Sequence, residues 1–168
     1  VPSNMSNEEQ LSISIFGLGY VGAVTAACLA QHGFDVVGVD VNRSKVDMIN
    51  KGQTPIVEEA IGDIIKRTVE SRKLTAMDNV AQAVANTNAS LVCVGTPSRS
   101  NGDLELTYVK RVTKQIGEAL AKKDDYHTVI IRSTVVPGTT EDVVLPILEK
   151  HSRKKAGIKF GLCFNPEF

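Results

Sequence analysis

Short apolar runs alternate along the chain with longer segments in which apolar residues recur every three or four positions. The apolar runs predict β-strands at about 11–16, 35–39, 73–76, 89–94, 128–131 and 158–164. The spaced segments predict helices at about 20–32, 44–51, 61–69, 79–84, 107–122 and 140–150. The run at 89–94 is apolar at nearly every position, which is typical of a strand buried on both faces in a parallel sheet.

Regular alternation of strand and helix predicts right-handed βαβ units and an α/β fold. We therefore expect one domain over residues 11–168, with a Rossmann-like, doubly wound, parallel six-stranded sheet and helices on both faces. In the segment 20–32, the apolar residues Val21, Val24, Ala27, Cys28 and Leu29 are expected to face the sheet.

Between the first predicted strand and helix lies the turn Gly17-Leu18-Gly19-Tyr20-Val21-Gly22, which fits the pattern G-x-G-x-x-G. In a dinucleotide site the three glycines of this pattern allow a tight turn, a close approach of the pyrophosphate and close packing of the helix on the sheet. The start of the helix then offers free N–H groups and the positive end of its dipole. A purely structural turn is the alternative interpretation.

Asp40 stands at the end of the second predicted strand, 18 positions after Gly22. A carboxylate there can accept hydrogen bonds from the adenosine ribose and would repel a 2′-phosphate, so NAD is the expected cofactor. Arg43 and Lys45 lie nearby and leave NADP as an alternative. Lys45 is expected either to pair with phosphate or ribose or to be solvated.

Ligands of such sheets bind beyond the carboxyl ends of the strands, here at the switch point between the first and fourth strands. Thr96 and Thr134 follow the fourth and fifth strands, and Glu167 follows the sixth. The Thr96 hydroxyl could touch the ribose or nicotinamide, and Thr134 could hold a water or the nicotinamide carboxamide. Each could instead serve only as a turn or cap residue. Glu167 could orient water or act as a base, although a surface role is the simpler interpretation when it is considered alone.

Composition narrows the function classes. Lys plus Arg and Asp plus Glu both total 19, so no basic excess favours nucleic acid or a membrane surface. Residues 1–10 are polar, unlike a signal peptide, and 1–4 resemble remnants of cloning before a native start at Met5, so 1–10 are expected to be a disordered extension. An odd number of cysteines without metal-binding spacing predicts buried, reduced thiols in a cytoplasmic protein and no metal site. The three histidines are expected to be structural or surface residues.

Together with the glycine turn, several segments make the chain resemble the nucleotide-sugar dehydrogenases, that is, the UDP-glucose and GDP-mannose 6-dehydrogenases. The resembling segments occur in the family's order at 15–22, 38–40, 92–97, 132–139 and 165–168. The segment 98–104 resembles the GDP-mannose branch more than the UDP-glucose branch.

This resemblance implies two successive NAD-dependent oxidations of a sugar C6 alcohol to a carboxylate, through a cysteine-bound thiohemiacetal and thioester. The positions that match cofactor-contacting residues of the family are Tyr20, Val21, Asp40, Lys45, Thr96 and Thr134. Thr134 also matches a position that helps to hold the catalytic water, and Glu167 matches a glutamate associated with thioester hydrolysis.

The family's nucleophilic cysteine lies in a second domain beyond residue 168, and none of Cys28, Cys93 and Cys163 matches it. The resemblance thus implies an N-terminal cofactor domain without its central helix and substrate domain. We expect it to bind NAD without turnover, and the full-length enzyme to be a homo-oligomer acting on GDP-mannose or UDP-glucose. A stand-alone NAD-sensing module and a β-hydroxyacid dehydrogenase are alternatives, although the ending 165–168 disfavours the latter.

Overall fold

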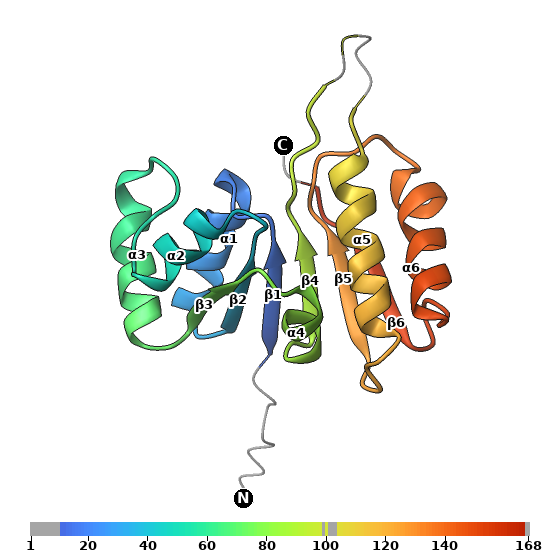
Figure 1. Cartoon of the computed structure of the whole chain (residues 1–168), viewed down its shortest axis with the longest axis horizontal. Helices are drawn as coiled ribbons and strands as arrows, with labels where there is room; N and C mark the ends of the chain where they lie inside the picture. The colour runs from blue at the N-terminus through green and yellow to red at the C-terminus, as the bar shows by residue number, and fades with distance from the viewer. Residues whose placement is uncertain (1–10, 99, 101–103, 167–168) are drawn as a thin grey trace, which may run out of the picture.

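One parallel sheet forms the centre of the molecule in the computed structural model, which describes residues 11–98, 100 and 104–166. Within these residues the sheet has six strands in the order β3-β2-β1-β4-β5-β6, and every neighbouring pair is parallel (Figure 1). The strands are β1 (Ser12–Phe16), β2 (Asp35–Val39), β3 (Leu74–Met77), β4 (Ala89–Val92), β5 (His127–Ile131) and β6 (Phe160–Phe164). The expected doubly wound sheet, with its switch point between β1 and β4, is confirmed.

Helices cover both faces of the sheet (Figure 1). On one face lie α1 (Tyr20–Gln31), α2 (Arg43–Asn50) and α3 (Glu59–Glu70). On the other lie α4 (Val80–Ala85), α5 (Thr107–Leu120) and α6 (Leu145–Ser152), the last preceded by a π-helical turn η1 (Thr140–Val144). None of the helices in the described part of the chain is long and apolar enough to cross a membrane.

The two-residue period of the strands separates the two cores. In β1, Ile13 and Ile15 join the core under α1 and α3, whereas Phe16 joins the core under α5. In β4, Val92 belongs to the α5 core and Leu91 packs against the α1 core. Each core therefore continues across the β1–β4 boundary instead of stopping there.

The buried face of α1 coincides with the expected one only in part. Its fully buried residues are Gly22, Ala23, Ala26, Ala27 and Ala30, and of the expected set only Ala27 is among them. Val21, Val24, Cys28 and Leu29 are half-buried on the flanks of the helix. Val24 and Leu29 pack against the core under α1 and α3, so the expected face is confirmed for part of the helix.

Other boundaries shift by a few residues. The run 89–94 was expected to be one strand, but β4 ends at Val92, whose carbonyl accepts hydrogen bonds from the amides of Arg132 and Ser133. Beyond this point the chain leaves the sheet and forms the wall of a cleft. The cysteines are free, but Cys163 is exposed, so the expectation of a buried thiol is wrong for this residue.

Candidate functional site

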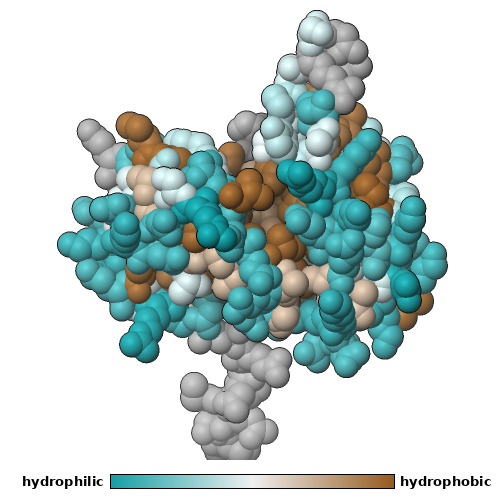
Figure 2. Space-filling model, viewed as in Figure 1, coloured by the Kyte–Doolittle hydropathy of each residue, from teal (hydrophilic) through white to brown (hydrophobic). Residues whose placement is uncertain are grey.

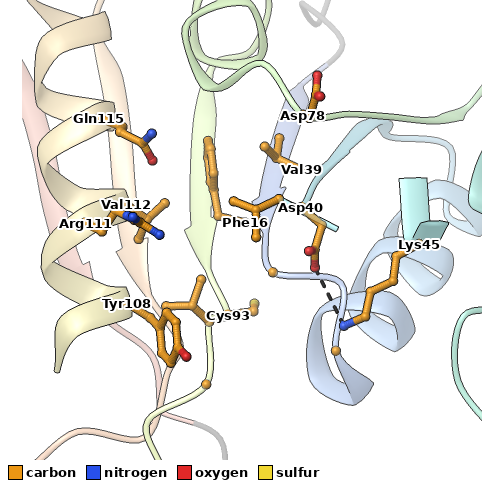
Figure 3. Close-up of a pocket in the computed structure, with 15 residues that line it drawn as sticks. Phe16, Val39, Asp40, Lys45, Asp78, Cys93, Tyr108, Arg111, Val112 and Gln115 are labelled. Carbon is orange, nitrogen blue, oxygen red and sulfur yellow. Dashed lines mark ion pairs between the residues drawn. The ribbon is translucent and has the colours of Figure 1, made fainter. Parts of the chain in front are cut away.

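A cleft opens at the carboxyl ends of β1, β2 and β4, with α5 on its far side. It has a volume of about 410 Å³. Figure 2 shows apolar side chains gathered in a central hollow between two hydrophilic halves of the molecule. The lining residues fall into an apolar floor and a polar rim, and Figure 3 labels ten of them: Phe16, Val39, Asp40, Lys45, Asp78, Cys93, Tyr108, Arg111, Val112 and Gln115.

The three glycines of the turn have different surroundings. Gly17 has φ +95°, and a Cβ there would lie 2.9 Å from the Cys93 carbonyl oxygen. A Cβ on Gly22 would lie 1.7 Å from the Gly17 carbonyl oxygen, so α1 can approach the turn only with glycine at this position. By contrast, a Cβ on Gly19 would meet no atom of the described residues within 4 Å. Packing within the protein therefore does not require glycine at position 19, and the space beside it is open to a ligand.

Gly19 is also the N-cap of α1, and no side chain caps the helix there. The N–H groups of the first turn of a helix lack intrahelical partners and carry the positive end of the dipole. They are thus suited to an anion, as the sequence pattern predicts. An open glycine at the start of such a helix fits the pyrophosphate of a dinucleotide.

Asp40 binds the glycine turn as well as facing the cleft. Its Oδ2 accepts a hydrogen bond of 2.7 Å from the Leu18 amide, and its Oδ1 accepts one of 2.8 Å from the Asn42 amide. The Lys45 ammonium lies 3.8 Å from Asp40 Oδ2 (Figure 3). Lys45 therefore lines the cleft and is not merely solvated on α2. Because a carboxylate offers about four acceptor sites, Asp40 retains capacity for ribose hydroxyls.

A second hollow of about 250 Å³ adjoins the first on the other side of Gly95. Among its lining residues are Gly19, Tyr20, Val21, Thr96 and Thr134. The Thr96 hydroxyl donates to the Thr134 carbonyl at 2.7 Å, which joins the loops that follow β4 and β5. Gly19, Cys93, Val94 and Gly95 line both hollows, so the two form one track across the switch point.

Tyr20, the first residue of α1, carries its hydroxyl to the segment that leads into α3. This hydroxyl donates to Glu58 Oε2 at 2.9 Å, and the bond to this carboxylate raises the pKa of Tyr20. This hydrogen bond joins the start of α1 to the segment before α3 at the edge of the second hollow.

The structure brings nearly all the predicted site residues together along this track. Gly17, Gly19, Asp40 and Lys45 line the first hollow. Glu167 lies outside the described residues, as do residues 99 and 101–103 of the segment that resembles the GDP-mannose branch. Arg132 lines the second hollow, and its guanidinium donates to the side-chain oxygen of Asn165, the residue that follows β6.

Sequence reasoning missed one wall of the first hollow. Tyr108, Arg111 and Gln115 reach it from α5, and Asp78 reaches it from the turn between β3 and α4. The spacing of the three α5 residues places them on one helical face, which in sequence looks like an ordinary solvated face. Only the position of α5 beside the β1–β4 switch point makes this face part of a site.

Comparison with known proteins agrees with this geometry. The family model for the UDP-glucose/GDP-mannose dehydrogenase family, NAD binding domain, matches residues 11–168. The GDP-mannose 6-dehydrogenase of Azotobacter vinelandii is 54% identical over 158 residues, which are 94% of this chain and 36% of that protein. A UDP-glucose 6-dehydrogenase of Haloferax volcanii is 39% identical over the same shares.

Among solved structures, a ternary complex of GDP-mannose dehydrogenase from Pseudomonas aeruginosa superposes with a TM-score of 0.91 at 49% identity. The match covers 93% of this chain and 36% of that one. The chain therefore spans little more than a third of the length of the relatives it matches, namely the part that the family model describes as binding NAD.

Proposed function

Because the chain belongs to the UDP-glucose/GDP-mannose dehydrogenase family as its NAD-binding domain, we propose that it is the cofactor half of a nucleotide-sugar 6-dehydrogenase acting on GDP-mannose. Relatives named GDP-mannose 6-dehydrogenase are 48–54% identical to it. Relatives named UDP-glucose 6-dehydrogenase are 39% and 35% identical. This difference supports GDP-mannose as the substrate of the whole enzyme.

The continuous track over Gly19 carries the proposal. We assign the adenosine half of NAD to the hollow beside Asp40, where the carboxylate accepts hydrogen bonds from ribose hydroxyls. The pyrophosphate lies over Gly19 and the first amides of α1, which Tyr20 and Val21 contribute. The nicotinamide half belongs in the second hollow. When bound, NAD supplies the acceptor for hydride from the sugar alcohol.

The remaining predicted residues receive roles from their place on this track. Lys45, close to Asp40, supplies positive charge toward the ribose and phosphate groups. Thr96 fixes the loop that carries Thr134, and Thr134 contributes to the nicotinamide side and to a water position there. Glu167 is assigned to hydrolysis of the covalent intermediate in the whole enzyme. We also propose that the whole enzyme is a cytoplasmic homo-oligomer.

Binding measurements on this chain test the proposal. Isothermal titration with NAD, NADP, GDP-mannose and UDP-glucose should give binding with NAD, weaker binding with NADP and none with either sugar nucleotide. Ligand that binds only the folded state at a hundred times its dissociation constant adds about 2.7 kcal/mol to the stability, so a thermal shift should accompany binding. No binding of either dinucleotide would refute the proposed function.

The variant Asp40→Asn distinguishes a role of Asp40 in ribose binding from a role in folding alone. The variant should weaken NAD more than NADP, because a neutral amide no longer repels a 2′-phosphate. Its unfolding midpoint should also fall, because Asp40 receives two backbone amides. Equal losses for the two cofactors would contradict the ribose assignment.

A further inference from the structure

Two polar side chains at the end of the first hollow away from the glycine turn have no role in the contacts proposed for ribose, pyrophosphate and nicotinamide. Asp78 lies in the turn between β3 and α4, and Gln115 lies on α5. We propose that these two side chains recognise the adenine base of the dinucleotide, and that Asp78 selects adenine over a deaminated base. The inference rests on the proposed function, since it concerns the same cofactor.

The positions of Asp78 and Gln115 in the cleft are the first support for this proposal. In Figure 3, Asp78 and Gln115 stand on opposite sides of the cleft, at the end remote from Tyr108 and the turn around Asp40. Both residues also line a neighbouring groove between α4 and α5, so they mark the boundary where the cleft ends. They are therefore the polar groups that an elongated ligand meets last.

The floor of the cleft is suited to a flat ring. Phe16, Val39 and Val112 form an apolar surface in front of the sheet, and Figure 3 shows the Phe16 ring between α5 and the end of β2. A slot with apolar walls and a few polar groups at its edge is the usual form of a site for a heterocycle.

The order of groups in the ligand then determines which one reaches Asp78 and Gln115. Pyrophosphate at Gly19 and ribose at Asp40 leave the base as the next group along the chain of the dinucleotide. With the ribose beside Asp40, the base extends over the apolar floor toward the end that Asp78 and Gln115 line.

Adenine presents an N6 amino donor beside the N1 acceptor. A carboxamide such as that of Gln115 can meet this pair with its oxygen and its NH₂ group. The Asp78 carboxylate can only accept, which suits the second N6 hydrogen. Its Oδ2 also accepts from Arg43 Nε at 3.0 Å, in a surface ion pair with 84% of the Arg43 side chain exposed.

The two side chains respond differently when the base is deaminated. Hypoxanthine carries an oxygen acceptor in place of the amino group and a proton on N1. Gln115 can turn its amide by 180° and still pair with this base, because its two ends exchange donor and acceptor. Asp78 cannot adapt and would place a negative charge against the new oxygen. Asp78 is therefore the residue expected to discriminate.

Titration calorimetry with NAD and nicotinamide hypoxanthine dinucleotide tests the assignment. The wild-type chain should bind NAD about tenfold more tightly than the hypoxanthine dinucleotide. This factor corresponds to the lower end of the range for a hydrogen bond to a charged group, because 44% of the Asp78 side chain is exposed. Asp78→Asn should bring the ratio of the two dissociation constants close to one. Gln115→Ala should weaken both ligands by a similar factor and leave the ratio unchanged.

Arg43→Gln is the matched control, since it removes the ion pair to Asp78 while leaving the carboxylate in place. The Arg43→Gln variant should still bind NAD more tightly than the hypoxanthine dinucleotide. Equal affinity of the wild-type chain for the two dinucleotides, or a preference that survives in Asp78→Asn, would overturn the inference while leaving the proposed function intact. Failure to bind either dinucleotide would overturn both. Asp78 and Gln115 are exposed, and circular dichroism verifies that the variants fold.

Discussion

Replacing Gly19 should affect NAD binding and replacing Gly22 should affect folding, although both lie in the same turn. Gly19→Ala places its methyl group in open space, with φ −76° compatible with any residue, so stability should stay unchanged. NAD affinity should fall by about tenfold or more, because the methyl group occupies the space proposed for the pyrophosphate. Gly22→Ala should instead lose about 3 kcal/mol of unfolding free energy, because its Cβ would overlap the Gly17 carbonyl.

Denaturant unfolding and calorimetry on the same samples check this pair. Gly62→Ala in α3 is the control, because within the described part of the chain its Cβ would meet only the Thr54 methyl group, at 3.8 Å, and Gly62 is not among the residues that line the cleft. It should raise stability by about 0.5–1 kcal/mol and leave NAD binding unchanged. An unchanged NAD affinity in Gly19→Ala would contradict the assignment of the pyrophosphate to this turn.

His127 is a second single residue with a measurable consequence. It is fully buried, and its Nδ1 donates to the Thr87 carbonyl at 3.0 Å, because a carbonyl can only accept. Its Nε2 then accepts from the Ser90 hydroxyl at 2.8 Å, and Ser90 contacts Ser14. Burial, aided by the charge of Lys123 and opposed by the bond to Thr87, lowers the pKa of His127 to about 4.

The sign of the pH effect follows from that shift. Between the unfolded pKa of about 6.5 and the folded value of about 4, the unfolded chain binds more protons, so stability falls as pH falls through this range. The loss should approach about 3 kcal/mol at pH 4, from 1.36 kcal/mol per pKa unit. Unfolding of wild type and His127→Gln between pH 7 and 4.5 tests this, and an equally steep dependence in the variant would contradict it.

At the scale of elements, the sequence predicts the order of helices and strands well. Apolar runs that alternate with amphipathic segments predict right-handed βαβ connections, and the doubly wound sheet and its switch point follow from these connections. In α5 the apolar residues recur at helical spacing and are all buried, because an amphipathic helix packs its apolar face on the sheet: Val109, Val112, Ile116, Ala119 and Leu120.

For α1 the same rule holds only in part: Ala27 is buried and Val24 and Leu29 pack against the core, but the other buried positions are glycine and alanine. At Gly22 the Gly17 carbonyl leaves no space for a Cβ, and Val24 and Leu29 lie half-buried at the edge of the core. For the site, strand-end residues such as Asp40 and Thr96 were predictable because parallel strands end at one edge. The α5 wall was not, since exposure of Arg111 and Gln115 gives no sign of which neighbour they face.

The β3 edge of the sheet gives an element-level prediction. Asn50, the last residue of α2, accepts from the Ala76 amide at 2.8 Å and donates to the Ala76 carbonyl at 2.9 Å. Its side chain thus takes the place of a further strand. Asn50→Ala should lower the unfolding free energy by about 1–2 kcal/mol, because both backbone groups lose their partners. Chemical denaturation measures this, and NAD affinity should not change, because Asn50 does not line the cleft.

At the scale of the whole molecule, the cofactor site lies where two halves of the sheet meet. The β3-β2-β1 half contributes Asp40 and the glycine turn, and the β4-β5-β6 half contributes Gly95, Thr96 and Thr134. Both hydrophobic cores cross the β1–β4 boundary, so we expect the halves to unfold together. A ligand in the cleft should then stabilise residues far from it.

Native-state hydrogen exchange tests this coupling in the two halves separately. The Val36 amide in β2 bonds to Lys73, and the Thr128 amide in β5 bonds to Asn88, both at strand ends remote from the cleft. With NAD at a hundred times its dissociation constant, exchange of both amides should slow by about a hundredfold, the equivalent of about 2.7 kcal/mol. Protection of only one amide would mean that the halves open independently and that the ligand does not join them. Equal protection would mean that binding at the switch point stabilises the sheet as one unit.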